Sequence, residues 1–94
     1  MVLSFAAIAS AFGDATRWRI LGELGRGTPL MVIELARLVG RSETVVSKHM
    51  AVLRKAGAVV IGRGRMYEIP AQFRVEPGVV DFGYGRLRML PQTV

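Results

Sequence analysis

The side chains best suited to contact another molecule lie in residues 42–57, SETVVSKHMAVLRKAG. At 3.6 residues per turn this stretch predicts a helix with two chemically different faces. Val46, Met50 and Leu53 form an apolar stripe, and the opposite face carries hydroxyls and cations around a small residue, Ala51. No carboxylate pair, metal-ligand cluster or nucleophile with an adjacent base accompanies it. We therefore expect this helix to bind another molecule and not to catalyse a reaction.

The chain has no cysteine and only one histidine, His49. The lack of cysteine excludes disulfides, thiol catalysis and every cysteine-based metal site, and it fits a reducing compartment. One histidine without clustered acids leaves no group for acid–base chemistry. We expect no enzyme activity, no cofactor, no bound metal and a cytoplasmic location. No apolar run approaches the roughly 20 residues of a membrane span, so no membrane partner is expected.

Positive charge is concentrated in one part of the chain. Thirteen Lys and Arg residues oppose 7 Asp and Glu residues, which gives a net charge of +6. Between residues 41 and 65 there is one acid, Glu43, and six bases: Arg41, Lys48, Arg54, Lys55, Arg63 and Arg65. Such a balance favours an anionic partner, with nucleic acid ahead of a membrane surface. The alternative is an ordinary solvated face, because charged runs usually face water.

Apolar spacing and capping residues predict four helices. They cover residues 3–12, the stretch ATRWRILGELGRG after the N-cap Asp14, the stretch VIELARLVG at 32–40, and the stretch after the N-cap Ser42. Only residues 40–42 separate the third helix from the fourth. Two helices joined by a three- or four-residue turn with a glycine are typical of a helix-turn-helix.

The region after the fourth helix predicts a β-hairpin. Residues 59–61 form one strand, GRG the turn and residues 66–69 the return strand, with arginines at the tip. The chain is then expected to be extended from Pro70, with a single strand over residues 79–90. The predicted fold class is mainly α with a β-hairpin wing, a winged helix-turn-helix in one domain over residues 1–94. Its parts are a dimerisation helix (3–12), the helix-turn-helix (32–57), the wing (58–69) and an extended C-terminal segment (70–94).

The first predicted helix is apolar nearly all round. Its large apolar residues are Leu3, Phe5, Ile8 and Phe12, with alanines between them. A helix of this kind is buried on more than one side. Burial in the protein's own core is one explanation, but 51% apolar residues in a 94-residue domain favour a second copy. We therefore predict that these four residues form the interface of a homodimer.

Three stretches carry a resemblance to a known family. FGDATRWRILGEL, ELARLVGRSETVVSKHMAVLRKAGAVV and GRGRMYEI resemble the ArsR-type winged-helix transcriptional regulators over about residues 3–69. The most specific part is VSKHMAVLRKAG. The resemblance implies a homodimer that binds operator DNA, usually as a repressor, and releases it when an effector or metal binds.

The chain departs from the family pattern at the metal site. Many members carry a box of the form ELCVCDLA where this chain has PLMVIELA, so Met31 and Ile33 stand at the two cysteine positions. Without thiolates these residues cannot hold a soft cation tightly. The C-terminal dimerisation helix of the family is not apparent either. Met31 and Ile33 either cover the dimer interface or line an apolar pocket, which would suit an unknown apolar effector.

The resemblance and the outward geometry together select the contacts to double-stranded DNA. The predicted DNA-binding residues are Arg41, Ser42, Thr44, Ser47, Lys48, His49, Arg54, Arg63 and Arg65. For His49 two roles stay open: packing against the neighbouring helix, or reaching a phosphate with its ring edge. The predicted function is a sequence-specific transcriptional regulator, most often a repressor, that binds an inverted-repeat operator as a homodimer. The alternative is a winged-helix module that binds an acidic protein and has little affinity for DNA.

Overall fold

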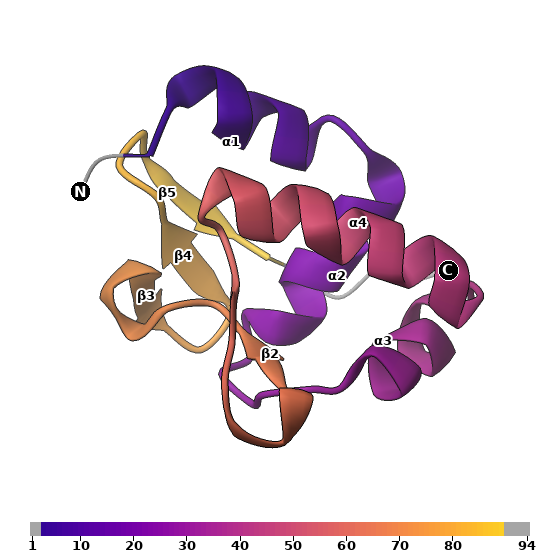
Figure 1. The fold of residues 1–94 in the computed structure, drawn as a ribbon. Coiled ribbons are helices and arrows are strands. Elements are labelled where there is room, and N and C mark those ends of the chain that lie inside the picture. The colour runs from indigo at the N-terminus through magenta and orange to yellow at the C-terminus, as the bar shows by residue number, and fades with distance from the viewer. Residues whose placement is uncertain (1–2, 90–94) are drawn as a thin grey trace.

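Four helices form the first half of the molecule, as predicted. The computed structural model describes residues 3–89. The helices are α1 (Phe5–Phe12), α2 (Ala15–Leu24), α3 (Val32–Val39) and α4 (Glu43–Ala56). In Figure 1, α4 lies in front of α2, α1 runs above α4, and α3 lies below the right-hand end of α4. Among these residues no helix is long and apolar enough to cross a bilayer.

Capping groups set the helix ends. The hydroxyl of Ser42 accepts a hydrogen bond from Val45 N at 3.2 Å, and Asp14 Oδ2 accepts one from Arg17 N at 2.9 Å. Both residues are therefore N-caps, as predicted. Helices α3 and α4 end at Gly40 and Gly57, whose φ angles of 69° and 84° are left-handed and favour glycine.

The core lies between α2, α3 and α4. The predicted stripe of Val46, Met50 and Leu53 on α4 is fully buried. It packs in one cluster with side chains of the two other helices: Ile20, Leu21, Leu24, Leu35, Ala36 and Val39. Because the stripe faces inward, the hydroxyl and amine face of α4 points outward.

The predicted wing is present but short. Strand β1 (Val60–Ile61) pairs with β2 (Tyr67–Glu68) in antiparallel fashion, and a 3₁₀ turn, Arg63–Arg65, forms the tip. Leu30, in the link before α3, exchanges two backbone hydrogen bonds with Tyr67, at 3.0 and 2.7 Å. The hairpin is thereby attached to the start of α3, which fixes its position relative to the helix-turn-helix.

The prediction of one strand over residues 79–90 is wrong in the part that the structure describes. After a 3₁₀ turn (Ala71–Phe73), strands β3 (Arg74–Glu76), β4 (Val79–Asp81) and β5 (Arg86–Arg88) form an antiparallel sheet in that order. The chain reverses between β4 and β5 because Gly83 and Gly85 adopt φ angles of 108° and 127°. The alternation of apolar residues and glycines resembles a strand, but these glycines belong to a turn. Residues 90–94 lie outside the described part.

Aromatic contacts join this sheet to the first two helices. Phe82 packs on Phe73 and on Phe12, at ring-centroid distances of 5.1 and 5.8 Å, and Phe12 packs edge-on against Trp18 at 5.2 Å. The Gly78 N–H donates to the carbonyl oxygen of Gly25, at the end of α2, at 2.9 Å. The C-terminal segment is thus a folded layer of the same domain.

The four residues of the predicted dimer interface divide into two groups. Leu3 and Ile8 are buried and Phe12 is partly buried within the single chain. Phe5 is 65% exposed and packs in a T-shaped arrangement with Tyr84, itself 47% exposed. Leu3 and Ile8 are therefore used inside the protomer, and Phe5 remains as exposed apolar surface. The dimer itself stays a prediction.

Candidate nucleic-acid interface

The outward face of α4 is exposed along its whole length. Thr44, Ser47, Lys48 and Ala51 are exposed, and so are Arg54, at the margin of this face, and Lys55. Ala51 has the smallest side chain of them, so little protrudes from the helix between the hydroxyls and the amines. This face can therefore approach the edges of bases closely and offer both donors and acceptors to them.

Two predicted residues lie in the turn before α4. Arg41 is exposed, and its backbone N–H closes the end of α3 by donating to Ala36 O at 3.1 Å. Ser42 is exposed too, but its oxygen already accepts the capping hydrogen bond. Its hydroxyl proton remains available to donate to a phosphate or a base.

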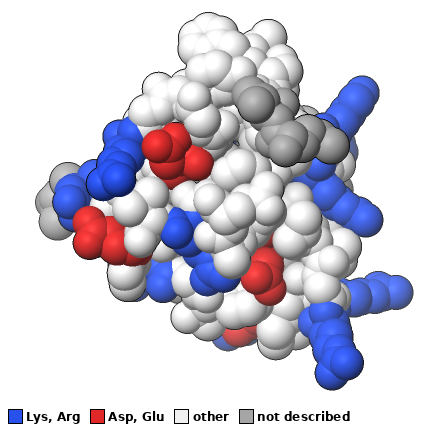
Figure 2. All heavy atoms as spheres, turned by 90° about the vertical axis from the view of Figure 1, so that its left-hand side faces the viewer, with Lys and Arg blue, Asp and Glu red and all other residues white. Residues whose placement is uncertain are grey.

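The basic side chains of this region make no ion pair with any acid of residues 3–89. The six are Arg41, Lys48, Arg54, Lys55, Arg63 and Arg65. Elsewhere Arg26, Arg74 and Arg88 each lie within 4.0 Å of a glutamate. In Figure 2, basic side chains project from the right-hand edge, which is the front of Figure 1, where α4 lies. The molecule thus presents unneutralised positive charge on the side of its exposed helix.

The wing tip is a tight turn that exposes both arginines. The Gly62 N–H donates to Met66 O at 2.8 Å, and Gly64 and Arg65 both have positive φ angles, of 68° and 58°. A positive φ is uncommon for a residue other than glycine. Arg63 and Arg65 are exposed on this loop, and neither guanidinium forms an ion pair with a carboxylate of residues 3–89.

Met31 and Ile33 line a groove between α3, α4 and the wing. The groove has a volume of about 550 Å³. Its lining includes Ile61 and Tyr67 from the hairpin, Ser47 from α4 and Arg65 from the wing tip. Met31 and Ile33 thus line a hollow, whose remaining lining includes the acid Glu43, and their second possible role, covering a dimer interface, stays a prediction. The hollow adjoins two residues predicted to bind DNA.

His49 lies beside the outward face and turns back towards α2. Its Nδ1 atom lies 3.1 Å from Arg17 Nη1 and 3.7 Å from Asp14 Oδ2, and its side chain is 20% exposed. The packing role is therefore realised in this structure. Helical periodicity predicts the position of His49 on α4. The contact with Arg17, 32 residues away, has no local signal in the sequence.

A comparison with protein families agrees with this geometry. The model of a family described as "Helix-turn-helix domain" matches residues 12–61, which is just over half of the 94 residues. The chain belongs to this helix-turn-helix family. The chain matches no curated protein.

The helix-turn-helix match extends from the end of α1 to β1. It includes the core of α2, α3 and α4, the turn at residues 40–42 and the whole outward face of α4. Four helices followed by a small antiparallel hairpin fit the winged form of this family. The family and the position of the exposed helix together indicate DNA binding and transcription regulation.

Asp14 caps the N-terminus of α2 and makes the stability of the fold depend on pH. The hydrogen bond from the Arg17 backbone N–H lowers the pKa of this carboxyl below its ordinary value. Because the native pKa is lower than the unfolded one, Asp14 stabilises the fold above the ordinary aspartate pKa. This contribution is lost as the pH falls through the lowered native value.

Two substitutions separate the cap from the charge. Asp14→Ala should lower the free energy of unfolding by about 1 kcal/mol at neutral pH, because a helix N-cap is lost. Asp14→Asn keeps a good cap and should lose less of its stability than the wild type between neutral pH and about pH 3. Urea unfolding at both pH values measures the difference. An identical acid dependence of the wild type and Asp14→Asn would contradict this role.

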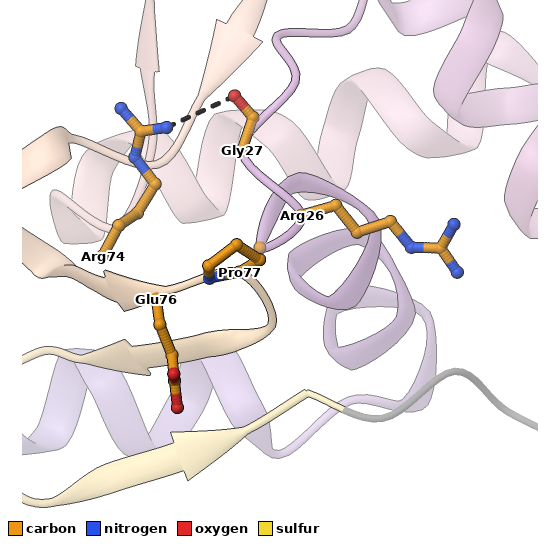
Figure 3. A pocket seen from close by; sticks show the side chains of 6 residues that line it. Arg26, Gly27, Arg74, Glu76 and Pro77 are labelled. Atoms are coloured by element: carbon orange, nitrogen blue, oxygen red, sulfur yellow. Dashed lines mark hydrogen bonds between the residues drawn. The ribbon is translucent and has the colours of Figure 1, made fainter.

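A second hollow lies where the end of α2 meets the C-terminal sheet (Figure 3), so the helix-turn-helix match contains only part of its lining. It has a volume of about 210 Å³. Arg74 donates from Nη1 to Gly27 O at 3.3 Å, whereas the guanidinium of Arg26 points away from the hollow. Arg74 thus ties the sheet to the loop after α2. Within residues 3–89, no three His, Cys, Asp or Glu side chains are grouped closely enough to hold a metal ion.

Proposed function

We propose that this protein is an ArsR-type transcriptional repressor that binds an inverted-repeat operator as a homodimer and has no enzyme activity. The observation that carries the proposal is the surface formed by α4 and the wing tip. It combines an exposed face of hydroxyls and amines with six bases that no acid of the described chain neutralises. Unpaired cations on one side of a small domain suit a polyanion.

In this proposal α4 enters the major groove, which is about 12 Å wide and admits one helix. Thr44, Ser47 and Lys48 then face the base edges, while Arg41 and Arg54 lie at the margins, closer to the phosphates. The wing arginines reach phosphates or the adjacent minor groove. Contacts to phosphates position the helix, and contacts to base edges read the sequence.

The exposed part of α1 supports a homodimer. Phe5 is 65% exposed beside Tyr84, and α1 contains no charged residue. In Figure 2 the very top of the molecule is white, without Lys, Arg, Asp or Glu. Large exposed aromatic side chains on an uncharged surface favour association. In a dimer, two copies of α4 would enter successive major grooves about 34 Å apart.

For the effector we propose an apolar small molecule bound in the groove beside α4. Met31 and Ile33 are 38% and 45% exposed there, and neither can supply the thiolate that a soft metal needs. A volume of about 550 Å³ lies in the usual range for small ligands. A ligand in this groove would contact Ser47 and Arg65, so it would compete directly with DNA.

The reading of bases by α4 can be tested on a duplex to which the protein binds specifically. Ser47→Ala and Thr44→Ala each remove a hydroxyl that, in this proposal, faces base edges in the major groove of the DNA. Each should relax the preference at particular base pairs by about 1–3 kcal/mol. Fluorescence anisotropy on a panel of single-base-pair variants of the duplex measures this change.

The fold should survive both substitutions, because both side chains are exposed and lie outside the buried stripe of α4. Circular dichroism and urea unfolding provide that control. An equal loss of affinity for every duplex would show that α4 rests on the phosphate backbone without reading bases. If neither substitution lowers the affinity for any duplex, the outward face of α4 does not contact DNA. That result would favour the protein-binding alternative.

A further inference from the structure

His49 connects the candidate recognition helix α4 to the start of α2. It is the only histidine of the chain. Its Nδ1 atom faces two groups of opposite charge, the guanidinium of Arg17 at 3.1 Å and the carboxylate of Asp14 at 3.7 Å. Which of the two it bonds decides which ring nitrogen carries the proton in the neutral imidazole.

The distances favour the bond to Arg17. A guanidinium stays protonated and can only donate hydrogen bonds, so a ring nitrogen facing it must offer its lone pair. The carboxylate of Asp14 would require a proton on Nδ1, but 3.7 Å is longer than a hydrogen bond. Nδ1 is therefore the acceptor, and the proton of the neutral ring lies on Nε2.

Arg17 is held in place by a second contact. Its Nη2 donates to the carbonyl oxygen of Ser10, in the last part of α1, at 2.9 Å. Its Nε is buried without a hydrogen-bond partner in the described part of the chain. The guanidinium therefore spans α1 and α4, and moving it away from His49 would also free the Ser10 carbonyl. Such a fixed donor gives the imidazole one preferred orientation.

The other edge of the ring carries Nε2. Among the described residues His49 Nε2 has no hydrogen-bond partner, and it is not one of the buried unpaired atoms, so it reaches solvent. It follows Lys48 on α4, at the side of the outward face. An N–H that is fixed in direction and open to solvent at this place is well suited to donate to an anionic oxygen.

We propose that Arg17 is a positioning residue that holds His49 as its Nε2–H tautomer, and that this N–H donates to a DNA phosphate at the edge of the major groove. The contact rests on the proposed function, since it needs DNA against α4. It would position the helix on the duplex without reading a base. His49 would then both pack against α2 and contact DNA, the two roles that the sequence leaves as alternatives.

The tautomer can be measured in the free protein. Because there is one histidine, nitrogen-15 NMR of the ring gives two assignable signals, and only the protonated nitrogen has the proton-bearing shift. At a pH where the ring is neutral, we expect the proton on Nε2. Arg17→Met should shift the signals towards a tautomer mixture. Arg19→Met is the matched control, because Arg19 is also on α2 but donates to Val39 O and Leu38 O.

Two outcomes would overturn the positioning role. One is a proton on Nδ1 in the wild type. The other is unchanged ring signals in a folded Arg17→Met variant. If Arg17→Met does not fold, the wild-type signals alone decide the tautomer, and Arg17→Lys, which keeps one donor, should retain them.

The phosphate contact is tested with two amide substitutions. The amide of Gln can place an N–H near the position of Nε2, whereas the shorter Asn reaches only the position of Nδ1. His49→Asn should weaken all duplexes nearly equally. The salt slope of binding should stay at the wild-type value, because a neutral N–H donor releases no counterion. His49→Gln should stay close to the wild type.

The results separate this inference from the proposed function. A wild-type affinity for His49→Asn, or equal losses for both variants, would contradict the phosphate contact while DNA binding itself stands. If the wild type binds no duplex, the proposed function and the phosphate contact both fail. The NMR measurement still decides whether Arg17 sets the tautomer.

Discussion

Replacing Arg63 and Arg65 together with alanine should weaken binding to every duplex and lower the salt slope by about two units per subunit. Each arginine that neutralises a phosphate releases about one counterion, so each lost contact removes about one unit of slope. At moderate salt we expect roughly a tenfold loss of affinity for each contact, about 1.4 kcal/mol. The preference among sequences should change little where these arginines contact phosphates, because phosphate contacts carry no sequence information. Titration of labelled duplexes at several salt concentrations measures both quantities.

The matched control is the double substitution of Arg86 and Arg88 with alanine. These residues are exposed on β5, in the C-terminal sheet, and their removal changes the net charge by the same amount. If only the overall charge attracts DNA, both double variants should lose equally. If the wing touches DNA, the β5 variant should keep the wild-type slope. Equal slopes for the two double variants would contradict the placement of the wing on DNA.

Leu53→Ala should lower the free energy of unfolding by about 2–5 kcal/mol, because a fully buried leucine leaves a cavity in the core. A domain of this size has a total stability of about 5–15 kcal/mol, so the loss is a large fraction of it. DNA binding should fall as far as the folded fraction falls. Urea unfolding followed by circular dichroism measures the change.

Val52→Ala is the control on the same helix. Val52 precedes Leu53 but is 40% exposed, and alanine has the higher helix propensity. The change in its unfolding free energy should stay within about 0.5 kcal/mol. A similar loss for both variants would mean that the two faces of α4 are not divided as the structure shows.

The helices and the outward face of α4 could be predicted because their signals are local. Val46, Met50 and Leu53 recur at helical spacing, and the caps Asp14 and Ser42 accept hydrogen bonds from residues three positions later. The same spacing that buries this stripe turns Thr44, Ser47 and Lys48 outward. Helix and cap chemistry depend on neighbours within about one turn, so a single sequence contains them.

The features that the sequence did not predict depend on residues far apart in the chain. The contact between Arg17 and His49 joins residues 32 positions apart, and the hydroxyl of Tyr84 donates to the carbonyl oxygen of Leu3. No periodicity indicates either contact. The burial of Ile8 within the protomer has the same origin, since an apolar helix predicts burial but not by which surface.

The C-terminal sheet was missed for a local reason. Val80 and Phe82 are buried as a single strand would have them, but Tyr84 is exposed and follows the turn at Gly83. Asp81 Oδ1 accepts a hydrogen bond from Gly83 N at 2.8 Å, a side-chain contact that starts the reversal. Glycines at alternate positions fit both a strand and a turn, and only the φ angles distinguish the two.

Selection of bound duplexes from a random pool tests the central claim most directly. A homodimer that reads bases through α4 should enrich one inverted repeat, with half-sites about one helical turn apart. Binding to that site should also weaken steeply as salt rises. A pool that remains random after repeated rounds, with weak binding to all duplexes, would contradict the account of this protein as a sequence-specific regulator.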